Sequence, residues 1–152
     1  MSAIFYIGSV MSFEEKYIWV LGVLAAATYA VYLAVMIPRL GTAPVGEVPY
    51  IDAMLWTIGG SIVASIVITI ILGIFSPRTA GKKDARDREI GRHGEYVGQG
   101  FVIAGALGAM ILAWLEVDWF WIANEIYLAF TLSAILGFIT KVVGYRAGLR
   151  RW

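Results

Sequence analysis

Residues 53–75 read AMLWTIGGSIVASIVITIILGIF and contain no charged side chain. A helix needs about 20 mostly apolar residues to cross a bilayer, so this stretch is long enough to do so. It lacks the alternation of polar and apolar residues found in membrane β-strands, and it is longer than such strands. The stretch therefore predicts a transmembrane helix.

Three further stretches have the same character. Residues 17–37, which precede Pro38, and residues 96–115 carry no charge, whereas residues 120–143 contain two charged residues near their ends. Because hydrocarbon cannot satisfy free backbone groups, only helices and closed barrels span it. We therefore expect four transmembrane helices, with Pro38 ending the first of them.

Composition and length agree with this assignment. Of the 152 residues, 60% are hydrophobic and 15% are charged, whereas soluble domains average roughly 25% charged residues. The length suggests one domain, and four spans with short connections would fill it. The predicted fold class is all-α: an integral membrane four-helix bundle forming a single transmembrane domain over residues 1–152, with a charged cytoplasmic loop at 76–95.

Basic residues are distributed unevenly over the ends of these spans. Of the 12 lysine and arginine residues, only Arg39 lies on the side of the first and third connections. Because cytoplasmic connections carry an excess of basic residues, both termini are expected in the cytoplasm, and the protein in the plasma membrane. Four tryptophans fall near the opposite face, where indole rings favour the headgroup region: Trp56, Trp114, Trp119 and Trp121.

Residues 1–10 are mildly apolar and lack the basic start and the length of a secretory signal. Two interpretations stay open: an interfacial stretch, or a true start at Met11.

Small residues recur at four-residue spacing in the second and third spans, a pattern that allows close helix packing in lipid. The second span contributes Ser61, Ser65, Thr69 and Gly73. The third carries Gly94, Gly98, Gly105 and Ala109 on one face, and Gly100, Ala104 and Gly108 on roughly the opposite face. Two contact faces would place the third span at the centre of the bundle or at the interface of a homodimer.

The turn before the fourth span is rich in acidic and aromatic residues. On a helix, Asp118, Trp121 and Glu125 share one face, and Asn124 precedes Glu125. Ionisable residues inside an apolar run are costly and mark functional sites by default. These four residues are therefore candidates to bind a cationic or lipophilic ligand, with Trp121 forming a cation–π wall. Alternatively, Glu125 reaches interfacial water, or stays protonated and bonds to a neighbouring helix, and Asn124 caps or cross-links helices.

Residues 82–95, KKDARDREIGRHGE, are dense in both signs of charge. One interpretation is an extension of the third helix at the membrane surface, held by ion pairs at helical spacing and by anionic headgroups. The other is a docking surface for a cytoplasmic partner. The candidate docking residues are Asp84, Arg86, Asp87, Arg88, Glu89 and Arg92.

No catalytic or cofactor motif is present. The sequence has no phosphate loop, no nucleophile elbow and no metalloprotease helix, and Gly98-x-Gly100 lies inside a span rather than after a strand. With one histidine, His93, and no cysteine, a zinc site lacks enough strong ligands. We expect no cofactor, no metal, no enzymatic activity and no direct nucleic-acid binding.

Two stretches carry a resemblance to a known family. Residues 83–90, KDARDREI, are similar to an Asp-Glu-Arg-Asp pattern before a third helix, and residues 120–127, FWIANEIY, to the opening of a fourth. Both patterns occur in a family of small, uncharacterised four-helix membrane proteins of bacteria and archaea. The match covers roughly residues 82–146, and Ala85 replaces the family's usual glutamate. Because such proteins are often encoded beside helix-turn-helix regulators, the resemblance implies a regulator as cytoplasmic partner.

These patterns favour a non-enzymatic membrane sensor or accessory protein. The 82–95 segment would dock a cytoplasmic regulator. A change at the outer Asp118–Glu125 face would tilt the third or fourth helix and reposition the Asp84–Glu95 segment. Two alternatives remain: a small transporter or immunity-type protein that acts through Glu125, and a structural subunit of a larger membrane complex.

Overall fold

The computed structural model describes residues 13–75 and 83–147. The N-terminal stretch 1–10 discussed above lies outside the described residues, as do the basic residues Arg78, Lys82, Arg150 and Arg151.

The described residues form four long helices and one short 3-10 turn. The helices are α2 (Phe13–Leu40), α3 (Ile51–Phe75), α4 (Ala85–Trp114) and α5 (Trp119–Ala147), and the turn is η1 (Val45–Glu47). All four helices are long and apolar enough to cross a membrane. The predicted all-α class with four span-length helices is therefore confirmed.

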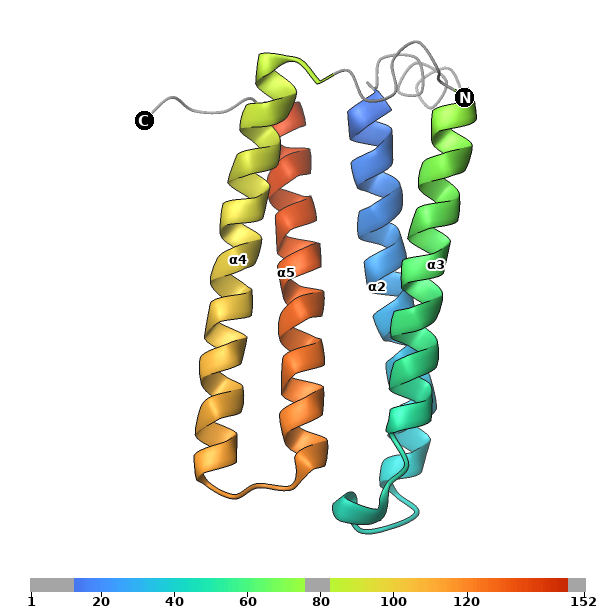
Figure 1. Cartoon of the computed structure of the whole chain (residues 1–152), viewed down its shortest axis with the longest axis vertical. Coiled ribbons are helices and arrows are strands. Elements are labelled where there is room, and N and C mark those ends of the chain that lie inside the picture. The colour runs from blue at the N-terminus through green and yellow to red at the C-terminus, as the bar shows by residue number, and fades with distance from the viewer. Residues whose placement is uncertain (1–12, 76–82, 148–152) are drawn as a thin grey trace.

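Consecutive helices are antiparallel and form two hairpins, α2–α3 and α4–α5 (Figure 1). Helix α5 packs against both α4 and α2, and α3 packs against α2. We call the end with η1 and the α4–α5 turn the hairpin end. The opposite end, where α2 and α4 begin and α5 finishes, is the charged end.

Two helix boundaries differ from the predictions. Pro38 does not end α2, because the helix continues to Leu40 with the proline in its last turn. The charged loop expected at 76–95 is shorter, since α4 begins at Ala85. A capping box explains this start: the Asp84 side chain accepts a hydrogen bond from the Asp87 amide, and the Asp87 side chain accepts one from the Asp84 amide.

Glycines bring α4 and α5 into close contact. The Cα of Gly105 faces the Ala129 methyl group, and a Cβ at Gly98 would lie 2.9 Å from the Ser133 Oγ. At the charged end, the Lys141 stem crosses the face of Gly94. The buried face of α4 therefore lies against α5 at backbone distance, which maximises van der Waals contact.

The opposite face of α4 has no such contact in its middle. Gly100 and Ala104 are exposed, and nothing described lies within 4 Å of a Cβ placed on Gly100. Gly108, the third residue of this stripe, instead faces the Glu125 carboxylate. Within one chain α4 therefore lies at the side of the bundle, not at its centre.

The small residues of α3 are also less closely packed than those of α4. The Ser61, Ser65 and Thr69 hydroxyls bond to carbonyl groups of their own helix. Thr69 also lies 3.4 Å from the Tyr17 hydroxyl of α2, whereas a Cβ on Gly73 would meet nothing described within 4 Å. Of all the α3 residues, only Ala53 is buried.

One cluster of buried aromatic and aliphatic side chains lies toward the hairpin end. Its members are Tyr32, Met36, Val48, Ala53, Phe120 and Tyr127. Arg39 closes this end with two hydrogen bonds to Asp52, of 2.8 and 3.0 Å, and a third to the Pro49 carbonyl. This bidentate pairing lowers the pKa of Asp52. These bonds thus join the end of α2 to the α2–α3 connection and to the start of α3, and η1 also contacts α5.

Candidate functional site

Glu125 lies about 9 Å along α5 from its first residue, at 1.5 Å per residue, and inside the apolar run. Its Oε1 lies against Gly108 of α4, where a Cβ would be only 2.6 Å away. Its Oε2 is buried and has no hydrogen-bond partner among the described residues. The absent side chain of Gly108 thus creates the space in which an unpaired carboxylate is held.

A hollow of about 460 Å³ opens beside this carboxylate. Helices α2, α4 and α5 and the α4–α5 turn all contribute to its walls. The lining residues are Tyr29, Leu112, Val117, Trp121, Asn124, Glu125 and Leu128. Ligand sites are typically 300–1,000 Å³ hollows with apolar and aromatic walls and a few polar groups, and this hollow has that character.

Asn124 is fixed by two hydrogen bonds. Its Nδ2 donates to the Phe120 carbonyl at 2.8 Å, and its Oδ1 accepts from the Tyr32 hydroxyl of α2. Of the roles predicted for Asn124, the structure shows the helix cross-link directly, while the residue also lines the hollow. The fixed amide leaves Glu125 as the polar group of the hollow that lacks a partner.

Tyr32, one end of this cross-link, packs against two further tyrosines, Tyr29 and Tyr127. The Tyr127 ring lies edge-on to those of Tyr29 and Tyr32, with centroids 5.2 and 4.8 Å apart, and its hydroxyl donates to the Thr57 Oγ1 at 3.0 Å. Sequence reasoning did not single out these residues. Tyr29 and Tyr32, three residues apart in a run of aliphatic residues, are the signal that could have identified them.

Asp118 and Trp121 differ in position. The Asp118 Oδ1 accepts a hydrogen bond from the Phe120 amide at 2.9 Å, and its Oδ2 lies over Gly46 in η1. It therefore caps α5 and touches the α2–α3 connection, and it does not line the hollow. Trp121 does line it, with its indole half-exposed. The four predicted ligand residues are thus divided between the hollow and the cap.

The predicted docking residues also fall into two groups. Asp84 and Asp87 form the capping box, and Asp87 accepts a 2.6 Å hydrogen bond from the Tyr145 hydroxyl. Arg86 donates to the Tyr145 carbonyl at 3.0 Å. Burial and the bond to Asp87 raise the pKa of Tyr145, which lies beyond the apolar run 120–143. Arg86 and Asp87 thus join the start of α4 to the end of α5, while Asp84 caps α4.

Arg88, Glu89 and Arg92 form the second group and are exposed. At about 100° per residue, Arg88 and Arg92 point away from Ile90, which is fully buried against Gly144 of α5. Arg88 donates a 3.4 Å hydrogen bond to the Lys83 carbonyl, and within the described part of the chain neither arginine forms a hydrogen bond or ion pair with α5.

Ion pairs also tie α2 to the charged end. Lys83 lies 3.6 Å from Glu14, and Arg146 lies 3.3 Å from Glu15. Both glutamates are buried. The charged end is therefore a junction of α2, α4 and α5, where ion pairs and hydrogen bonds lie beside the apolar contact of Ile90 with Gly144.

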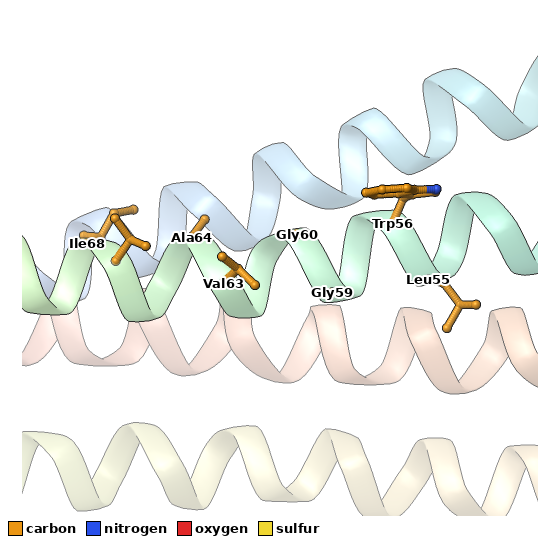
Figure 2. A pocket seen from close by; sticks show the side chains of 8 residues that line it. Leu55, Trp56, Gly59, Gly60, Val63, Ala64 and Ile68 are labelled. Atoms are coloured by element: carbon orange, nitrogen blue, oxygen red, sulfur yellow. The ribbon is translucent and has the colours of Figure 1, made fainter.

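A further hollow, of about 670 Å³, lies on α3 alone. Figure 2 shows Trp56 and Leu55 at one end and Ile68 at the other, with Gly59 and Gly60 between them. Its walls carry no ionisable side chain. The hollow results from the missing side chains of the two glycines and offers no group that would select a ligand.

Within residues 13–75 and 83–147, no three histidine, aspartate or glutamate side chains converge as metal ligands would. In comparisons with known proteins, no protein-family model, no curated protein and no solved structure matches the chain.

Proposed function

We propose that the protein is a non-enzymatic integral membrane protein that binds an amphipathic organic cation at Glu125. The proposal rests on one observation: the Glu125 Oε2 atom is buried, and no hydrogen-bond donor among the described residues contacts it. A carboxylate in apolar surroundings is costly unless a cation or several donors compensate it. Among residues 13–75 and 83–147, the one basic side chain at the hairpin end, Arg39, is paired with Asp52.

The membrane setting is supported by the four apolar helices and by the exposed tryptophans. Trp56, Trp114 and Trp119 are each at least 70% exposed, and all three lie toward the hairpin end, as expected for indoles in a headgroup region. Apart from Arg39, every basic side chain that the structure describes lies toward the charged end. We therefore propose a plasma-membrane protein with the charged end in the cytoplasm.

The walls of the hollow favour an organic cation over a metal ion. Tyr29 and Trp121 present aromatic rings to it, and Leu112 and Leu128 present aliphatic groups. Aromatic faces attract organic cations, whereas hard metal ions require several oxygen ligands. One carboxylate between aromatic walls thus suits a lipophilic ammonium or phosphonium group.

Glu125→Gln should weaken binding of tetraphenylphosphonium about tenfold or more, because removal of a carboxylate from a buried ion pair costs at least 1.4 kcal/mol. Binding is measured by equilibrium dialysis on protein in nanodiscs, with neutral triphenylphosphine oxide as the uncharged probe. Glu116→Gln, an exposed change of the same charge in the adjacent turn, is the matched control and should bind like the original chain. Equal affinity of the original chain for both probes would disprove the proposal.

A second candidate function is docking of a cytoplasmic regulator through the start of α4. It is favoured by the exposure of Arg88, Glu89 and Arg92 on the side of α4 opposite its α5 contact. Helix α5 would couple the two activities, because it carries Glu125 near one end and Tyr145 and Arg146, bonded to α4 and α2, at the other. A ligand that shifts α5 would then reposition the docking surface.

Reversing two charges, Arg88→Glu with Arg92→Glu, should remove a cytoplasmic partner from the protein isolated in mild detergent, as judged by mass spectrometry. Charge reversal at an interface weakens binding through repulsion as well as loss of attraction. Retention of every bound protein would refute the docking proposal.

The chain has no cysteine, so a cysteine introduced by Arg92→Cys reports on which side of the membrane residue 92 lies. If the charged end is cytoplasmic, a membrane-impermeant maleimide should label this cysteine only after the cells are lysed.

A further inference from the structure

Two hollows meet on the side of α5 that faces away from Glu125. One, of about 500 Å³, lies toward the charged end between α2, α4 and α5, and the other, of about 630 Å³, lies between α2, α3 and α5. Ala134 lines both, so the two hollows adjoin at this residue, and we call them together the groove. By helical rotation, Phe130 and Ala134 lie roughly opposite Glu125. This groove is therefore separate from the proposed cation site.

The groove is polar at one end only. Toward the charged end, Lys141, Glu95, Gln99 and Ser133 line it. The remainder is mostly aliphatic and aromatic, with only a few hydroxyl groups. A hollow with charged groups at its mouth and an apolar interior matches an amphiphile, whose headgroup and tail need opposite environments.

The charged mouth contains both signs. Lys141 Nζ lies 3.9 Å from Glu95 Oε1, and the Glu95 side chain is 77% exposed whereas that of Lys141 is 24% exposed. The Lys141 stem lies across Gly94, which fixes the direction of its ammonium group. Because this ion pair is long and Glu95 is exposed, an anionic group can bind Lys141 while a cationic group binds Glu95. Headgroups with a single charge would meet repulsion from one of the two residues.

The groove is long enough for an acyl chain that crosses one leaflet, because its lining on α5 runs from Lys141 to Ala123, about 27 Å at 1.5 Å per residue. From Lys141 to Phe130 the α5 axis advances about 16 Å at 1.5 Å per residue. That is about half of the ~30 Å hydrocarbon thickness of a bilayer. A lipid chain that enters beside Lys141 would thus reach the bilayer midplane near Phe130.

We infer that this groove is a binding site for a zwitterionic phospholipid of the phosphatidylethanolamine type, in the leaflet at the charged end. Its phosphate binds Lys141, its primary ammonium binds Glu95, and one acyl chain lies along α5 past Ala134. The inference does not depend on the cation site at Glu125.

The test compares three phospholipids with identical acyl chains: phosphatidylethanolamine, phosphatidylcholine and phosphatidylglycerol. Binding to the detergent-solubilised protein is measured by native mass spectrometry as lipid-bound fractions. We expect phosphatidylethanolamine to bind about two- to fivefold better than either competitor, the ratio expected for one largely exposed ionic contact. Glu95→Gln and Lys141→Met should each abolish the preference. Because Glu95 is exposed, its variant should fold normally.

A second pair of variants tests the groove itself. Ala134→Trp places an indole where the two hollows meet, and it should lower binding of all three lipids. Ala106→Trp, an equal change at an exposed position of α4 that lines neither hollow, should leave binding unchanged. Equal binding of the three headgroups, a preference for phosphatidylglycerol, or normal binding by Ala134→Trp would each overturn the inference.

Discussion

Replacement of Gly105 by alanine is expected to separate α4 from α5 and to destabilise the protein by about 1–3 kcal/mol, the usual cost of overpacking. The added methyl group would coincide with the Ala129 methyl group, which is attached directly to the α5 backbone and cannot turn aside. The helices themselves would have to move apart. Unfolding in mixed detergent–dodecyl sulfate micelles, followed by tryptophan fluorescence, measures the loss.

Gly100→Ala is the matched control for this substitution. It makes the same chemical change five residues earlier in the same helix, but nothing described lies within 4 Å of the new methyl group. Alanine also favours helix by up to about 1 kcal/mol over glycine. The Gly100→Ala protein should therefore be as stable as the original chain or slightly more stable. Equal losses at both positions would show that α4 packs in another orientation.

Gly22→Ala should loosen the contact between the two hairpins, again by about 1–3 kcal/mol. Gly22 of α2 lies beneath the Phe138 ring of α5, and a methyl group there would overlap the ring. The ring has little freedom to move, because Trp19 packs edge-on against it with centroids 5.1 Å apart. The same micelle titration measures the effect.

A double-mutant cycle distinguishes steric overlap from a general effect of the substitution. Phe138→Leu removes the flat ring, so Gly22→Ala should cost much less in that background than in the original chain, giving a coupling energy of at least about 0.5 kcal/mol. Gly60→Ala on α3, where a methyl group meets nothing described within 4 Å, should have no comparable effect. Additive losses from Gly22→Ala and Phe138→Leu would contradict the proposed overlap.

The sequence predicted the helices well and their ends less well. Long uncharged runs are sufficient to identify span-length helices because their chemistry permits little else. The start of α4 at Ala85 depends instead on two hydrogen bonds between Asp84 and Asp87, which charge counting does not reveal. The extension of α2 past Pro38 likewise depends on local geometry that a proline rule overlooks.

Contacts between helices were less predictable than the helices themselves. Gly100 and Gly105 both belong to small-residue stripes, yet only Gly105 meets α5, because the partner's position decides which stripe is used. The bond between Tyr32 and Asn124 joins residues 92 positions apart, beyond the reach of any local pattern. Asp118 was grouped with Glu125 by helical spacing, but it lies where α5 begins and serves as its cap.

The order of the helices also affects how the protein is made. Chains are synthesised from the N-terminus, and membrane helices insert before they pack together. The α2–α3 pair can form early, whereas the buried face of α4 and the free side of α2 both wait for α5. Since α5 follows α4 in the chain, the nascent protein holds α4 without its main partner until α5 has also left the ribosome. A premature stop codon before α5 would therefore remove one wall of both the proposed cation site and the proposed lipid groove. It would also expose the glycine face of α4 to membrane proteases.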